Sequence, residues 1–245
     1  MSIDVQQTVR EVALNNPAAT RVFEKLGIDY CCGGNRPLAQ ACGEAQIPIQ
    51  KVIDSIESAA RFAQVRQDTP FAEDWSKAPL SDLIAHINNT HHKYTREEIA
   101  RLGPLFDKVC NVHGPSHPEL LEIRHDFHAL AQELTVHMMK EERVLFPFIE
   151  RMEEAVVARE PVIPAPFGSV SNPVSMMIHE HDTAGNLLRE MRKRSDGYQP
   201  PAGACSSYKT LYSALAEFER DLHQHIHLEN NILFPRAVDL ETSRN

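Results

Sequence analysis

The chain has 245 residues, of which 42% are hydrophobic, and its 34 Asp and Glu outnumber 25 Lys and Arg to give a formal charge of -9. A chain of this size can bury one large core or two small ones, and its acidic balance disfavours nucleic-acid binding. No secretory signal and no apolar run of about 20 residues is present, so we expect a cytoplasmic protein without a membrane segment. The five cysteines do not form the paired framework of a small secreted domain, so we expect reduced thiols.

Residues 1–66 predict a small helical domain that carries two adjacent cysteines. In the stretch NNPAATRVFEKLG, Asn16 suits a helix N-cap and Gly27 suits the helix end. The loop DYCCGGNRP follows and contains Cys31 and Cys32. Adjacent thiols in a Gly-rich loop could bind a soft metal, exchange disulfides or react with an oxidant, or they could be small residues in a turn.

Residues 67–79, QDTPFAEDWSKAP, have the composition of a linker. Beyond it, residues 80–245 show helical periodicity and no strand-like alternation. The predicted fold is therefore all-α, with the small N-terminal helical domain followed by an antiparallel four-helix bundle. The four long helices are expected at Leu80–Cys110, Pro118–Glu153, Val174–Arg194 and Ser206–Val238.

The second and fourth predicted helices each place a histidine and a glutamate within an apolar stripe. His137 and Glu141 continue the stripe of the second helix, and His225 and Glu229 do the same in the fourth. The segments HMMKEERVLFP and HIHLENNILFP share the pattern H-x3-E-x3-LFP. A buried carboxylate costs several kcal/mol unless it is paired, so we expect a divalent cation between these helices.

The third and first helices each supply one more histidine. His181 interrupts an otherwise apolar stripe 44 residues before His225. The residue 45 positions before His137 is His92, whereas the spacing of the preceding apolar residues favours His91. We choose His92 because it fits the repeat, and His91 remains the alternative.

Four histidines and two carboxylates fit a dinuclear centre. If both glutamates bridge, each ion has two nitrogen and two oxygen ligands, with room for an oxo or hydroxo bridge and an exchangeable position. Such a set suits two non-haem iron ions better than a closed structural zinc site. Ferritin-type centres use Glu-x-x-His twice, and only Glu122 and His125 have that spacing here. The predicted metal ligands are His92, His137, Glu141, His181, His225 and Glu229.

Four neighbours of these ligands have two interpretations each. Glu133 lies one turn before the histidine of the second helix, and Glu180 directly precedes that of the third. Both are either solvated helix charges or residues that support a ligand or line a channel. Pro147 and Pro235 each follow Leu-Phe and must disturb the helix just past its glutamate, for packing or to shape the site.

The combination of DYCCGG with HMMKEERVLFP, EHDTAG and HIHLENNILFP resembles the RIC (repair of iron centres) family of di-iron proteins over nearly the whole chain. The C-terminal part resembles a hemerythrin-type HHE bundle, and the first part resembles the short cysteine-bearing domain of those repair proteins. The resemblance implies the same six iron ligands and favours His92 over His91. It also implies a stress-response protein that helps to restore iron-sulfur clusters damaged by nitric oxide or peroxide.

Three functions follow as hypotheses. In the first, the protein donates iron to damaged clusters, with Cys31 and Cys32 as transient acceptor or docking thiols. In the second, the di-iron centre is an enzyme that binds or reduces nitric oxide, and in the third it is a hemerythrin-like module that binds or senses dioxygen. The expected partners are proteins with damaged clusters and these small ligands, with no nucleic acid and no membrane, and the chain is expected to be a monomer or a homodimer.

Overall fold

The computed structural model describes residues 3–65, 75–161 and 166–242. The predicted linker at residues 67–79 lies outside the described residues as far as residue 74. None of the described helices is long and apolar enough to cross a lipid bilayer. The chain divides into two compact units. The first contains Met1–Pro79 and Ile226–Pro235, and the second contains Leu80–His225 and Arg236–Asn245.

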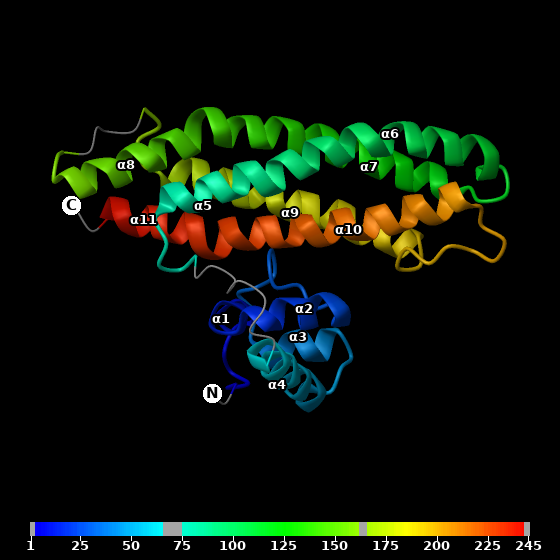
Figure 1. Cartoon of the computed structure of the whole chain (residues 1–245), viewed down its shortest axis with the longest axis horizontal. Coiled ribbons are helices and arrows are strands. Elements are labelled where there is room, and N and C mark those ends of the chain that lie inside the picture. Colours follow the sequence, from blue (N-terminus) through cyan, green and yellow to red (C-terminus); the bar gives the residue numbers. More distant parts are fainter. Residues whose placement is uncertain (1–2, 66–74, 162–165, 243–245) are drawn as a thin grey trace. The chain divides into compact units, whose positions relative to one another are not determined.

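The described N-terminal residues form short helices around a core of their own (Figure 1). The helices are α1 (Val9–Asn15), α2 (Pro17–Leu26), α3 (Leu38–Glu44) and α4 (Ile49–Val65). Phe23, Leu38 and Val52 are fully buried in this core. Because a domain of this size has little apolar surface to bury, the few large core residues carry much of its stability.

The caps of these helices follow the predicted pattern in part. Gly27 ends α2 in the left-handed conformation with φ 67°, as predicted. Asn16 stands at the N-cap position of α2, as predicted, but its side chain makes no capping hydrogen bond. The reason is local, since Asn16 is also the C-cap of α1 and its backbone has to connect the two helices.

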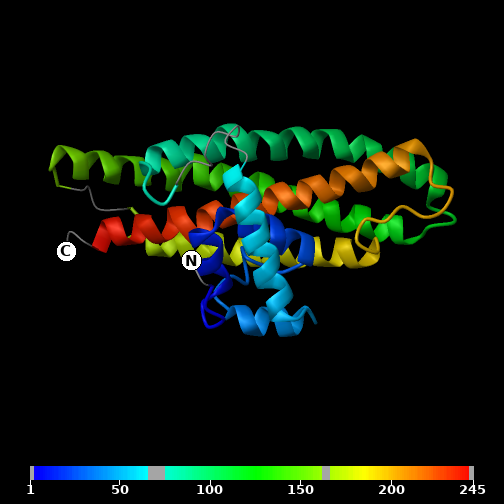
Figure 2. The ribbon, with the colours of Figure 1, turned by 60° about the horizontal axis from the view of Figure 1, so that its bottom comes forward.

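The remaining described residues form four long helical rods with alternating chain direction (Figures 1 and 2). The rods are α5 (Leu80–His86), η1 (Ile87–His92) and α6 (Lys93–His113); α7 (Glu119–Lys140), η2 (Glu141–Leu145) and α8 (Phe146–Ala158); α9 (Ser171–Arg194); and α10 (Ser206–Leu228), η3 (Glu229–Leu233) and α11 (Phe234–Thr242). Helix α7 packs along α9 and α6, and α5 packs along α8. The described residues contain no strand, which confirms the predicted all-α fold and its antiparallel four-helix bundle.

Carboxylates from other rods cap the starts of two bundle helices. The backbone N–H groups of Leu80 and Ser81 donate to Glu153, at 2.6 and 2.9 Å. In the same way, the backbone N–H of Val170 donates to Glu241 at 3.0 Å. Each carboxylate satisfies donors that the first turn leaves open and complements the positive end of the helix dipole. The two caps occupy corresponding places in the two helix pairs, in keeping with the repeated H-x3-E-x3-LFP pattern.

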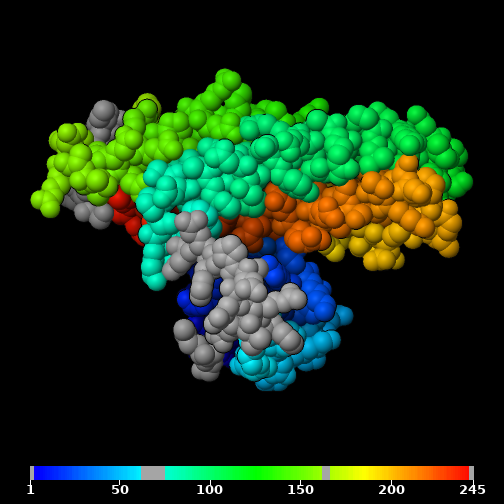
Figure 3. All heavy atoms as spheres, viewed as in Figure 1, coloured from blue at the N-terminus to red at the C-terminus, as the bar shows by residue number. Residues whose placement is uncertain are grey.

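Aromatic packing fills the bundle between these rods. Phe127 on α7 is 1% exposed, and its ring lies 5.1 Å from the ring of Phe106 and 5.8 Å from that of Phe218, measured between centroids. On the face seen in Figure 3, the atoms of neighbouring rods close over this interior. Three rods therefore meet at one ring, which fixes their spacing.

Replacing this ring tests how far the bundle depends on it. We expect Phe127→Ala to lower the free energy of unfolding by about 3–5 kcal/mol, because the lost ring leaves a cavity that the rods cannot fill. Urea unfolding followed by circular dichroism measures the change. Val157→Ala is the control, since Val157 is 80% exposed and should change little. Equal losses in the two variants would show that the ring has no special place in the core.

Candidate metal centre

The six predicted ligands converge inside the bundle in two overlapping groups. One group is His92, Glu141, His225 and Glu229, and the other is His137, Glu141, His181 and Glu229. Within each group the candidate ligand atoms all lie within 4.8 Å of one another. None of the six side chains is more than 2% exposed. The two groups share both glutamates, so each contains two imidazoles and two carboxylates.

The imidazoles face each other in pairs. The Nε2 atoms of His92 and His225 are 3.1 Å apart, and those of His137 and His181 are 3.0 Å apart. Two nitrogens about 2.1 Å from one ion, at a right angle to each other, are about 3.0 Å apart. Each pair is therefore spaced as two ligands of a single ion would be.

The carboxylate of Glu141 lies between the two pairs. Its Oε2 atom is 3.4 Å from Nε2 of His92 and 3.3 Å from Nε2 of His137. One oxygen thus approaches a histidine from each group. Two carboxylates fully enclosed in an apolar bundle need positive charge nearby, and divalent cations supply it. The donor set fits an ion of borderline softness, such as iron or zinc.

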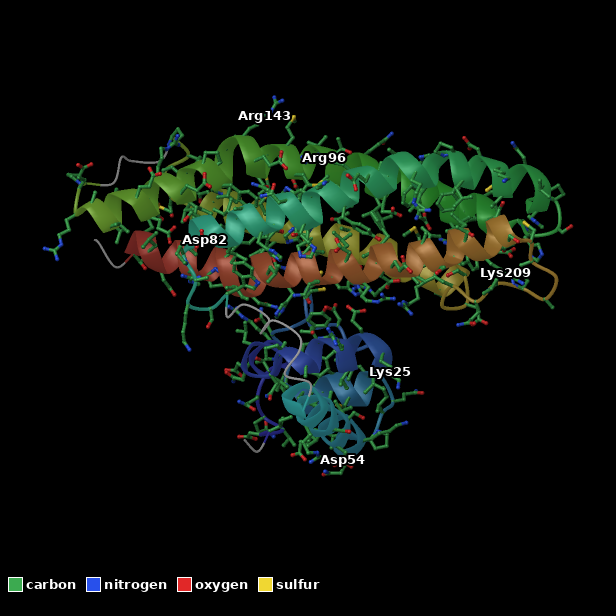
Figure 4. All side chains as sticks on the ribbon, in the orientation of Figure 1. Lys25, Asp54, Asp82, Arg96, Arg143 and Lys209 are labelled. Atoms are coloured by element: carbon green, nitrogen blue, oxygen red, sulfur yellow. The ribbon has the colours of Figure 1, made fainter. Side chains whose placement is uncertain are left out.

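A carboxylate outside the group orients His92. The Nδ1 atom of His92 is 2.8 Å from Oε1 of Glu142, and Arg96, labelled in Figure 4, donates to the same oxygen at 2.7 Å. Burial opposes ionisation of Glu142, but the hydrogen bonds from Arg96 and His92 outweigh it and lower the pKa of this carboxyl. The partner on Nδ1 leaves Nε2 to face inward, which is the usual arrangement around a metal-binding histidine.

Glu180 has the same role for His137. Its Oε2 atom lies 2.9 Å from Nδ1 of His137, and its Oε1 accepts a hydrogen bond from Lys140. Burial is again outweighed by the hydrogen bonds from Lys140 and His137, so the pKa of Glu180 is lowered. Two interpretations were open for Glu180, a solvated helix charge or a residue that supports a ligand or lines a channel. Its contact with the candidate ligand His137 favours the second.

Three of the four rods carry a π-helical turn where the candidate ligands lie. The turn η1 ends at His92, η2 begins at Glu141 and η3 begins at Glu229. In η2 the N–H of Phe146 donates to the carbonyl of Glu141, and in η3 the N–H of Phe234 donates to that of Glu229. Such turns insert one residue into the helix and are frequent at functional sites.

The repeated Leu-Phe-Pro sequence explains why η2 and η3 lie where they do. Pro147 and Pro235 have no backbone N–H, so the ordinary hydrogen bond to the carbonyl four residues earlier cannot form. The predicted disturbance past each glutamate therefore takes the form of a π-helical turn. The preceding phenylalanine also contributes, since the ring of Phe146 stacks on His92 with centroids 5.7 Å apart.

The turn η1 also explains the ambiguity between His91 and His92. The apolar spacing that favours His91 assumes an ideal helix, and the π-helical turn shifts the register by one residue before His92. His92 joins a candidate ligand group, whereas Nδ1 of His91 lies 3.0 Å from Asp221. His91 is nevertheless buried, and its ring stacks on His225 at 5.7 Å.

A surface groove opens beside one pair of candidate ligands. His137 and His181 line it together with Glu133, Lys140 and Glu180. Glu133 is exposed on α7. A groove that reaches two candidate ligands offers a route for a small molecule or an ion, and Glu133 adds negative charge along it.

The predicted thiols lie in a turn organised by Asp29. Its Oδ1 accepts hydrogen bonds from the backbone N–H groups of Cys31 at 3.1 Å and Cys32 at 3.0 Å. Cys31 is 4% exposed, while Cys32 is partly exposed. The hydrogen bond to Cys32 and burial raise the pKa of the Cys31 thiol, and the negative charge of Asp29 adds to the effect. The thiol of Cys31 is therefore protonated at neutral pH.

Some residues around the candidate ligands were missed by sequence reasoning. Glu142, which follows Glu141 directly, and Asp221 were not singled out in the sequence. Phe146 belongs to the repeated Leu-Phe-Pro sequence, which was a usable signal. For Glu142 and Asp221 the sequence holds no such signal, because their partners lie on other rods.

A helical bundle that encloses histidines and glutamates in this pattern is the hemerythrin class of cation-binding fold. The chain matches the hemerythrin HHE cation binding domain over residues 83–237, and a domain of unknown function, DUF542, over residues 5–60. It is also 38% identical over 232 residues to the iron-sulfur cluster repair protein YtfE of Pectobacterium carotovorum, covering 95% of this chain and 96% of that protein.

Other relatives agree with that match. The protein of the same name from Pectobacterium atrosepticum is 38% identical over 232 residues, and that from Yersinia pseudotuberculosis is 36% identical over 235 residues. Each alignment covers 95% of this chain and 96% of the relative. The chain therefore belongs to the RIC family, with a hemerythrin-type cation-binding domain.

Neutralising an outer carboxylate tests its effect on metal binding. We expect Glu180→Gln to weaken retention of the bound metal by about 10–100-fold, because His137 loses the charge that fixes its ring. Competition with a chelator measures the affinity. Glu122→Gln, an exposed change on α7, is the control. Equal affinity in both variants would mean that Glu180 does not support the site.

Proposed function

We propose that this protein restores damaged iron-sulfur clusters by supplying iron from a di-iron centre in its bundle. The observation that carries the proposal is the pair of buried groups that share Glu141 and Glu229. Two non-haem irons, with an oxo or hydroxo bridge, fit this donor set. The damage is expected from nitrosative or oxidative stress, and the relatives' name, iron-sulfur cluster repair protein, supports the repair function.

The residues of the chain have distinct parts in this proposal. The four imidazoles and two glutamates hold the ions, and Glu142 and Glu180 fix two of the rings. Bound iron supplies a store of reducible metal that can be delivered or can carry electrons. Because Glu180 and Lys140 line the groove next to His137, a change in their ion pair alters access to that side of the site. Glu133 would guide cations along the same groove.

The thiols of Cys31 and Cys32 are proposed to receive or dock the iron. Iron binds to thiolates, so the thiol of Cys31, whose pKa is raised, would release its proton as the iron arrives. The expected clients are proteins with damaged clusters, which are cytoplasmic, and the chain acts as a monomer or a homodimer.

The groove favours a second candidate function, in which the centre binds a small ligand such as nitric oxide or dioxygen. A route that ends at His137 and His181 would serve such a ligand as well as it serves iron. The two functions differ in whether iron leaves the protein. If the second is right, the iron content stays constant while nitric oxide is bound or reduced.

Removing one candidate ligand tests the centre. We expect His181→Ala to bind fewer than the two irons of the natural chain and to restore no clusters, because one group loses an imidazole. Iron analysis with Mössbauer spectroscopy gives the count and the coupling of the ions. His179→Ala, an exposed change on the same helix, is the control. Two irons in the His181 variant would contradict the ligand assignment.

The thiols are tested separately. We expect replacement of both Cys31 and Cys32 by serine to abolish restoration of a damaged cluster in a purified assay, while the bundle keeps its iron. Cys205→Ser is the control, because Cys205 is an exposed thiol in the bundle domain. Unchanged restoration in the double variant would remove the thiols from the mechanism.

A further inference from the structure

The adjacent thiols belong to a three-residue cluster that has the geometry of a cation site. The side chains of Asp29, Cys31 and Cys32 bring a carboxylate oxygen and two sulfurs within 4.8 Å of one another. The carboxylate comes from the residue that shapes the turn, so the cluster is fixed by the backbone. It contains none of the candidate ligands of the bundle.

The sulfur spacing matches that of two ligands on one ion. The Sγ atoms of Cys31 and Cys32 are 3.8 Å apart. Two sulfurs bound at about 2.3 Å to a tetrahedral ion are also about 3.8 Å apart, whereas a disulfide would need about 2.05 Å. Oδ1 of Asp29 lies 3.4 Å from Sγ of Cys31, close to the roughly 3.6 Å expected for oxygen and sulfur ligands of one such ion.

The backbone of this loop is held in place by a close approach at Gly34. A Cβ atom on Gly34 would lie 2.7 Å from the carbonyl oxygen of Tyr30, which is too close for any side chain. The N–H of Arg10 also donates to the carbonyl of Gly34 at 2.8 Å. The second glycine of the CCGG sequence therefore lets the loop close on Tyr30, the residue directly before Cys31, and this contact holds the backbone of the thiol loop in place.

Charge balance selects a divalent ion. The single S–H of Cys31 lies within hydrogen-bond distance of both Asp29 and Cys32, so a proton occupies the place where an ion would sit. When a divalent cation binds, both thiols release their protons to solvent and two metal–sulfur bonds form. The net charge of the cluster stays at minus one, and no electron is transferred. The cluster, in which Cys31 is buried and the other two side chains are partly exposed, thus gains no uncompensated charge.

We propose that Asp29, Cys31 and Cys32 form a second cation site, for a thiophilic divalent ion such as Fe²⁺ or Zn²⁺. Two sulfurs exclude Mg²⁺ and Ca²⁺, which take oxygen ligands. Three protein ligands leave the fourth tetrahedral position open, so a further ligand can enter and take the ion over. The role of this site in iron transfer rests on the proposed function, which the site deepens. The binding of the ion at the site does not depend on the proposed function.

Cobalt provides a direct probe of the site in the full chain, with a non-thiol reductant present. We expect one equivalent of Co²⁺ to give a sulfur-to-cobalt charge-transfer band in the near ultraviolet, since the candidate ligands of the bundle contain no sulfur. Cys31→Ser and Cys32→Ser should remove the band. Asp29→Asn keeps an oxygen for the backbone hydrogen bonds of the turn, and it should weaken Co²⁺ binding by about tenfold or more.

Matched thiol variants complete the test. Cys42→Ser removes another buried thiol of the N-terminal domain, and Cys205→Ser removes an exposed one. Both should keep the band. Absence of a band in the natural chain, a band that survives in both Cys31→Ser and Cys32→Ser, or equal affinity in Asp29→Asn would overturn the proposal.

The outcome is distinguishable from that of the proposed function. A chain that restores clusters but gives no cobalt–sulfur band keeps the repair function and loses the second site. A chain that gives the band but restores no clusters keeps the second site and loses the repair function. Circular dichroism of each variant shows that loss of the band is not loss of the fold.

Discussion

Two glutamates enclosed in an apolar bundle are the constraint on which the rest of the structure depends. Glu141 and Glu229 have no exposed surface, and each is placed there by a rod whose other inward residues are mostly apolar. Isolated carboxylates at such depth would cost several kcal/mol each or would take up protons. As metal ligands the four imidazoles are neutral, so they do not compensate the charge of the carboxylates. The arrangement becomes favourable when cations occupy the space between the two groups, so metal binding and stability of the bundle interior are coupled.

The helix backbone is adapted to the same constraint. An ideal helix would present the inward positions in a single register along each rod, but three of the six candidate ligands, His92, Glu141 and Glu229, lie in the turns η1, η2 and η3. The inserted residue rotates the following part of the rod, so that Phe146 stacks on His92 beyond η2. The prolines after η2 and η3 lower the free-energy cost of the π-helical turn, because the α-helical hydrogen bond that the turn would break cannot form at a proline. The Leu-Phe-Pro sequence thus acts on the metal centre through the backbone.

The sequence predicted the fold class and most of the helix positions because periodicity and the internal repeat are strong signals. The stripe that holds His137 and Glu141 and its copy at His225 and Glu229 predicted which residues come together. The first rod was harder, since the π-helical turn before His92 breaks the period from which inward residues are read. The contacts of Glu142 and Asp221 could not be predicted, because both residues contact histidines on other rods. The spacing of residues within one helix does not indicate which rods pack together. The carboxylate of Asp29 was likewise overlooked, since its part depends on how the chain turns at Cys31.

The two clusters differ in a way that follows from their donors. The groups in the bundle hold carboxylates and imidazoles, which suit iron in either oxidation state, and each has four protein ligands. The cluster at Asp29 has two sulfurs and one oxygen, which suit a divalent ion, and its ligands must lose protons before they bind. The affinity of this cluster for the ion therefore falls as the pH falls, because protons compete with the ion for the thiols. The raised pKa of Cys31 strengthens that competition. An ion held by fewer ligands against such competition is easier to give up, which is the property an exchange site requires.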